Sequence, residues 1–150
     1  MDTPRQFFHA YVKRSYEAWS DAPTDFLLAS CAVHQANVML ERVVRDQNPT
    51  LPAKELSKLV KERRKKLAET NADFGLVRDI DDTHKHLELT RGKRPTSVVG
   101  GAWGSSWWGM WGESWGTREI VVPLDDGTQR PLAAILKNVI AMWERTLRGE

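Results

Sequence analysis

Several features that mark large protein classes are scarce or absent in this sequence. Cys31 is its only cysteine, which excludes an intramolecular disulfide and a cysteine-rich zinc module. No apolar run reaches the roughly 18 residues of a transmembrane helix, and the charged, amphipathic N-terminus does not resemble a secretory signal. The formal charge is only +2, which does not by itself predict a nucleic-acid partner. We expect a soluble cytoplasmic protein that does not enter membranes, with Cys31 as a buried thiol.

Common catalytic and cofactor motifs are also missing. The chain has no Gly-x-Ser-x-Gly sequence, and its glycines lack the Gly-Lys-Ser/Thr ending of a phosphate-binding loop. Asp79, Asp82 and His86 share one face of an expected helix, and His34 in an earlier helix is a further metal-type ligand. This spacing is generic, and the other interpretation is a solvated acidic face. We therefore predict neither a metal nor another cofactor.

Helical periodicity dominates what is present. The 150 residues are enough for one domain, 1–150, and 41% of them are hydrophobic. Apolar residues recur at three- and four-residue spacing in five segments, which predicts helices over about 4–19, 25–45, 53–69, 71–90 and from 131 onward. Thr3, Thr24 and Asn71 are the expected N-terminal caps. The second segment is apolar on more than one face, as is typical of the central helix of a bundle.

The third predicted helix is strongly basic. Between residues 54 and 66 it carries seven Lys or Arg against two Glu, including the run Arg63, Arg64, Lys65 and Lys66. One interpretation is an ordinary solvated outer face. The other is an electrostatic surface that binds the phosphate backbone of a nucleic acid.

Residues 100–116 differ in kind from the rest of the chain. They hold five of the seven tryptophans, and four of these recur every four residues: Trp103, Trp107, Trp111 and Trp115. The many glycines disfavour a helix, whereas an extended chain would keep all four rings on one side. Three interpretations remain: a flap that covers the bundle, a docking surface for a protein partner or a second copy, and a stacking platform for single-stranded bases.

A small β-hairpin is expected between this repeat and the last helix. Residues 119–124 read as a strand, 125–127 as a turn with glycine, and 128–130 as a short returning arm. The repeat and the hairpin together form an insertion over about 96–130. The predicted fold class is therefore mainly α, a bundle of four or five helices with a Trp/Gly-rich insertion and a hairpin before the last helix.

The fourth predicted helix contains the most suggestive motif. Arg78 is followed at once by Asp79, and His84 comes six residues after Arg78. This pattern resembles the Arg-x4–6-His motif of the HEPN domain family, small helical bundles that include metal-independent ribonucleases. The resemblance covers roughly residues 4–92 and 131–148. It implies a HEPN-like fold, a homodimer whose two motif helices meet, and catalytic roles for Arg78, Asp79 and His84.

The residue types suit that chemistry. Metal-independent RNA cleavage needs a base for the 2′-hydroxyl proton and an acid for the leaving oxygen, and histidine serves as either near neutral pH. A guanidinium stabilises the charge that develops on phosphorus. The leading hypothesis is thus a HEPN-like RNA-binding or RNA-cleaving protein of defence or toxin type. The alternative is a non-enzymatic helical assembly or interaction protein whose Trp-rich segment docks a partner.

Overall fold

The computed structural model describes residues 3–85, 120–124 and 126–150, except for the side chains of residues 84, 85 and 123. Its helical elements are α1 (Pro4–Phe7), η1 (Phe8–Lys13), α2 (Arg14–Asp21), α3 (Phe26–Gln47), α4 (Ala53–Thr70), α5 (Ala72–Lys85) and α8 (Leu132–Leu147). Because α1, η1 and α2 are continuous, the described chain contains five helices, and the expected mainly helical fold with a hairpin before the last helix is confirmed. The Trp-rich repeat lies outside the described residues.

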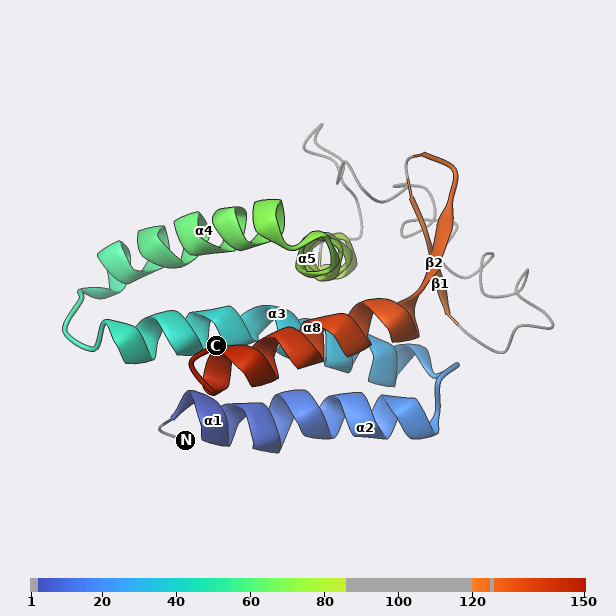
Figure 1. Ribbon diagram of the computed structural model, residues 1–150, viewed down its shortest axis with the longest axis horizontal. Coiled ribbons are helices and arrows are strands. Elements are labelled where there is room, and N and C mark those ends of the chain that lie inside the picture. The colour runs from blue at the N-terminus through green and yellow to red at the C-terminus, as the bar shows by residue number, and fades with distance from the viewer. Residues whose placement is uncertain (1–2, 86–119, 125) are drawn as a thin grey trace.

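The helices form three tiers around a central helix (Figure 1). The N-terminal helix lies along one side of α3, and α8 lies beside α3 in the middle tier. On the other side, α4 runs back above α3, while α5 crosses the remaining helices and is viewed end-on. The two ends of the described chain lie at the same end of the bundle, where Arg5 donates to the carbonyl of Leu147 at 3.1 Å.

The helix starts follow local hydrogen-bonding rules. Thr3 caps the first helix in a reciprocal capping box with Gln6. Asn71 caps α5 as expected, accepting from the backbone N–H of Phe74 at 3.0 Å. The expected cap of α3 is wrong by one residue, because Asp25 rather than Thr24 accepts from the N–H of Leu28. Asp25 takes this role since its extended backbone aims the carboxylate at the first turn.

A π-helical stretch, η1, interrupts the N-terminal helix. A π turn takes more residues than an α turn, so side chains three positions apart no longer return to the same side. Phe8, Val12 and Trp19 are buried as the periodicity predicts. Tyr11, three positions after Phe8, is instead 45% exposed, with its ring against that of Phe7 at a centroid distance of 5.1 Å.

The core is centred on the contact of α3, α5 and α8. Trp143 of α8 is buried and donates through Nε1 to the backbone carbonyl of Ala36 in α3 at 2.9 Å. Its ring also meets Phe74 of α5 edge-to-face, with centroids 5.9 Å apart. One large side chain therefore joins three helices that are far apart in the sequence.

One side of α3 remains open, contrary to expectation. Cys31 is an exposed free thiol rather than a buried one. Leu27, one turn earlier on the same side, is 72% exposed. The neighbouring helices cover the other sides of α3. This helix therefore carries more apolar side chains than the described fold buries. No helix in the described part of the chain is both long and apolar enough to cross a membrane.

The hairpin consists of β1 (Val121–Pro123) and β2 (Gln129–Pro131), paired antiparallel with Val122 opposite Arg130. Its turn places Gly127 at φ +84°, a conformation in which glycine avoids the strain of a Cβ atom. The returning arm begins one residue later than expected and runs directly into α8.

An ion pair fastens this hairpin to α5. Arg130 donates to the carboxylate of Asp73 in the first turn of α5, and Asn138 of α8 donates to the same carboxylate at 2.6 Å. Burial alone would raise the pKa of Asp73. The hydrogen bonds from Arg130 and Asn138, with the positive charge of Arg130, outweigh burial and hold that pKa below its ordinary value.

Candidate functional site

A buried polar cluster lies between α3 and α5. The carboxylate of Asp81 in α5 is 2% exposed and is contacted by two side chains of α3. Nδ1 of His34 lies 3.1 Å from Asp81 Oδ1 and 3.3 Å from Oδ2. Asn37 donates through Nδ2 to Oδ2 at 2.7 Å. A buried carboxylate requires such partners, because an unpaired charge is very unfavourable away from water.

Helix geometry explains why these three residues meet. His34 and Asn37 are three positions apart, so both side chains lie on the side of α3 that faces α5. They are polar residues within the largely apolar run from Ala32 to Leu40. This cluster was missed at the sequence level, where His34 was considered only as a metal ligand. Two polar residues three apart on an otherwise buried face were the available signal, since such residues need a polar partner across the interface.

The His34–Asp81 pair has the geometry of an oriented base. The side chain of His34 is 43% exposed, whereas that of Asp81 is 2% exposed. With Nδ1 donating to the carboxylate, Nε2 is the acceptor and remains able to take a proton from a ligand. The carboxylate fixes the ring orientation and stabilises the imidazolium that forms. This arrangement supports proton transfer at Nε2 of His34.

The residues of the expected Arg-x5-His motif lie on the same helix. Arg78 donates through Nε and Nη2 to Asp79 Oδ1, at 3.2 and 3.0 Å. Asp79 is buried, while the side chain of Arg78 is 31% exposed. A guanidinium carries five N–H groups, so this pair leaves donors of Arg78 for other acceptors.

His84 belongs to α5, but its side chain lies outside the described part of the structure. Arg78 precedes Asp81 by three residues and His84 follows it by three, so these positions occupy successive turns along one side of α5. Helix α5 therefore carries Arg78 and His84 of the expected motif, and also Asp81. The pairing of Asp81 with His34 was not part of that motif. Thr83, between Asp81 and His84, donates to the carbonyl of Asp79 at 2.8 Å.

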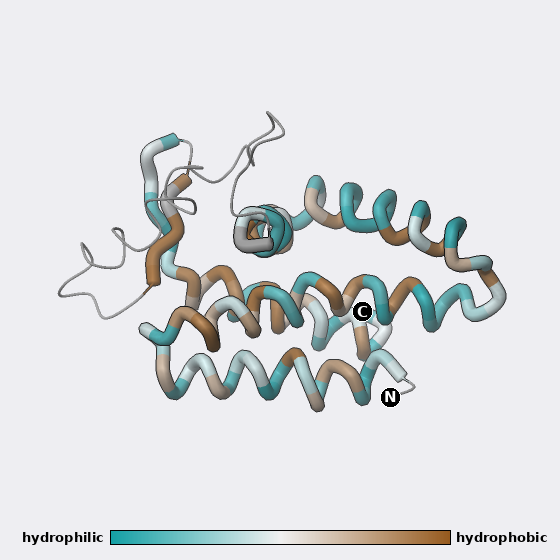
Figure 2. The backbone as a smooth tube through the Cα atoms, turned by 180° about the vertical axis from the view of Figure 1, so that it is seen from behind, coloured by the Kyte–Doolittle hydropathy of each residue, from teal (hydrophilic) through white to brown (hydrophobic). Residues whose placement is uncertain are grey.

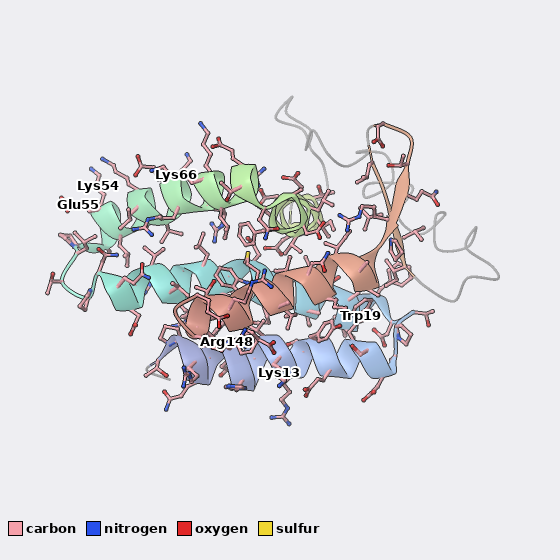
Figure 3. All side chains as sticks on the ribbon, in the orientation of Figure 1. Lys13, Trp19, Lys54, Glu55, Lys66 and Arg148 are labelled. Atoms are coloured by element: carbon pink, nitrogen blue, oxygen red, sulfur yellow. The ribbon has the colours of Figure 1, made fainter. Side chains whose placement is uncertain are left out.

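The basic run of α4 divides between two environments. Arg63, Lys65 and Lys66 are exposed, whereas Arg64 is half-buried. Figure 2 shows α4 hydrophilic along its outer side, with hydrophobic segments on the side turned toward α3. Lys54 and Lys66 both project away from the bundle (Figure 3). The outer face of α4 is thus available to solvent or to an acidic partner.

Other candidates are less informative in the described part of the chain. No group of three or more His, Cys, Asp or Glu side chains there is arranged to hold a metal ion. His86, which was considered with Asp79 and Asp82, lies outside it, as do all four repeat tryptophans: Trp103, Trp107, Trp111 and Trp115. The sequence-level interpretations of the repeat therefore remain predictions.

Comparison with known proteins identifies no relative of this chain. No protein-family model, no curated protein and no solved structure matches this chain.

Proposed function

We propose that this protein binds RNA and cleaves it without a metal ion, in the manner of a HEPN-like ribonuclease of defence or toxin type. The supporting observation is the half-exposed imidazole of His34, held through Nδ1 by the buried carboxylate of Asp81. An oriented histidine of this kind serves general base catalysis near neutral pH.

In the proposed reaction, Nε2 of His34 takes the proton from a ribose 2′-hydroxyl. The 2′-oxygen attacks the adjacent phosphorus, and the bond from phosphorus to the 5′-oxygen breaks. The 5′-oxygen then takes a proton from another side chain, which acts as the general acid. We assign this acid to His84 and the stabilisation of the phosphorane charge to Arg78. The products are a 2′,3′-cyclic phosphate and a 5′-hydroxyl end. Asp79 holds Arg78 in place.

We infer that the working unit is a homodimer in which two copies of α5 approach one another. The resemblance to the HEPN family implies this arrangement, and a two-fold axis doubles the acid, base and cationic groups at the site. Light scattering at micromolar concentration should give about twice the 17.1 kDa of one chain. A monomer that retains full activity would contradict the composite site.

The direct test is a cleavage assay on a single-stranded oligoribonucleotide with EDTA present. His34→Gln and His84→Ala should each slow cleavage by about 100-fold or more, because each removes a proton-transfer group. His9→Gln is the matched control, since His9 is exposed on the N-terminal helix and outside the cluster. Its rate should equal that of the wild-type protein.

A wild-type rate in His34→Gln would exclude His34 as the base. A complete absence of cleavage by the wild-type protein would refute the enzymatic proposal. It would favour the alternative, a helical interaction protein that docks a partner through its Trp-rich segment.

We infer a cytoplasmic location on the ground that the one cysteine, Cys31, is an exposed free thiol.

A further inference from the structure

Asn37 is a buried amide in an apolar part of α3. Its side chain belongs to a residue that is 2% exposed, and Val33 and Leu40, one turn before and one turn after it on the same side of the helix, are buried apolar residues. An amide in such surroundings is unfavourable unless its hydrogen-bonding groups find partners. The presence of Asn37 at this position therefore calls for an explanation other than packing.

The two polar atoms of this amide are in different situations. Nδ2 donates to Oδ2 of Asp81 at 2.7 Å, whereas Oδ1 is buried and has no partner in the described part of the chain. Turning the amide over would place Oδ1 against the carboxylate and replace an attraction by a repulsion, so the orientation is fixed. The hydrogen bond that accounts for a buried amide here is therefore the one to Asp81.

This hydrogen bond acts on His34 through Asp81. A hydrogen bond donated to a carboxylate stabilises its ionised form, and an ionised carboxylate can only accept. The imidazole must then donate from Nδ1, which lies 3.1 Å from Oδ1 of Asp81, and its lone pair is left on Nε2. A protonated Asp81 would instead donate to Nδ1. The proton of the neutral ring would then be on Nε2, where it prevents His34 from acting as a base.

We propose that Asn37 is a positioning residue: acting through Asp81, it holds the neutral imidazole of His34 with its proton on Nδ1 and its lone pair on Nε2. This tautomer is a property of the folded chain alone. Its use in RNA cleavage, with Nε2 as the base, rests on the proposed function. The competing explanation is that Asn37 only satisfies a buried carboxylate and fixes how α5 crosses α3.

The tautomer is measured directly by nuclear magnetic resonance. Protein with 15N-labelled histidine is studied at about pH 8, where a neutral imidazole predominates, and two-bond 1H–15N correlations distinguish a ring nitrogen that carries a proton from one that does not. The chain has four histidines, and His34→Gln identifies the signals of His34 by their loss. Asp81→Asn is the reference for a lost acceptor, because its amide can donate to Nδ1 and so favours a proton on Nε2.

Two variants of α3 are compared with these spectra. Asn37→Leu and Gln35→Leu each replace an amide by an apolar side chain, but Gln35 lies about 200° around the helix axis from Asn37. Leucine at position 37 removes the N–H and leaves Asp81 able to rotate or to take up a proton. The form of His34 protonated on Nε2 should therefore appear in Asn37→Leu, as in Asp81→Asn. It should be absent from the wild-type protein and from Gln35→Leu.

The cleavage assay supplies a second readout. Asn37→Leu should lower kcat by about tenfold or more, as is typical when the group that orients a functional histidine is lost. KM should change less than about twofold, because no contact with the substrate is removed. Gln35→Leu should keep both wild-type values. Absence of cleavage by the wild-type protein would refute the proposed function, whereas the tautomer measurement would still decide the role of Asn37.

Two results would overturn the inference: a proton that stays on Nδ1 of His34 in Asn37→Leu, or a proton on Nε2 of His34 in the wild-type protein. The first result, combined with a lower melting temperature, would show that Asn37 is only a structural partner of Asp81. Circular dichroism checks that each variant is folded. If Asn37→Leu does not fold, Asn37→Ala removes the same donor without added bulk and should give the same Nε2-protonated form. A proton on Nδ1 in that variant would equally overturn the inference.

Discussion

Replacing Trp143 by phenylalanine tests the contact that joins α3, α5 and α8. The indole N–H that donates to the carbonyl of Ala36 is lost, and a hydrogen bond of this kind contributes about 0.5–1.5 kcal/mol net. The smaller ring also leaves part of a fully packed space empty. Full truncation of a buried aromatic side chain costs about 3–5 kcal/mol, and phenylalanine keeps most of the ring, so we assign about 1–2 kcal/mol to the void. The free energy of unfolding should fall by about 2–3 kcal/mol.

The assay is urea denaturation followed by far-UV circular dichroism, because other tryptophans dominate the fluorescence. With a slope of about 2 kcal/mol/M, the midpoint should fall by about 1–1.5 M. Tyr11→Phe is the control, since its ring is 45% exposed, and it should change stability by no more than about 0.5 kcal/mol. A loss below about 1 kcal/mol for Trp143→Phe would refute the reasoning, because the smallest values of the two contributions together are about 1.5 kcal/mol.

Further predictions concern single local contacts. The pKa of Asp73 is lowered in the folded protein. The ionised Asp73 therefore stabilises the fold fully above the ordinary carboxyl pKa, and this stabilisation is lost as the pH falls through the lower pKa of the folded protein. In thermal melts, the advantage of wild type over Asp73→Asn should shrink below about pH 4. Thr3→Ala removes the capping box and should cost about 0.5–2 kcal/mol in urea denaturation, and an unchanged midpoint would contradict it. Gly127→Ala forces a side chain into positive φ and should cost about 1 kcal/mol by the same assay, while no loss would mean that the turn adopts another conformation. Cys31 is exposed and should react with a thiol reagent without denaturant, whereas protection until unfolding would show that this side of α3 is covered.

Local hydrogen bonding and periodicity were readable from the sequence. The caps Thr3 and Asn71 and the helical periods depend on residues within a turn or two of one another, so no knowledge of the fold is needed. The hairpin before the last helix was predicted for the same reason, with its returning arm displaced by one residue. Where a neighbouring residue competes for the same role, as Asp25 does with Thr24, sequence patterns place a boundary only approximately.

Tertiary structure decided which polar and apolar residues meet. The pairing of His34 with Asp81 joins residues 47 positions apart, and it depends on how α5 crosses α3, which no local pattern encodes. The exposure of Cys31 and Tyr11 has a similar origin, because composition counts apolar residues but does not say which side of a helix finds a neighbour. The half-buried position of Arg64 is also a product of packing. The sequence shows four consecutive cations, and only the approach of α4 to α3 separates Arg64 from its exposed neighbours.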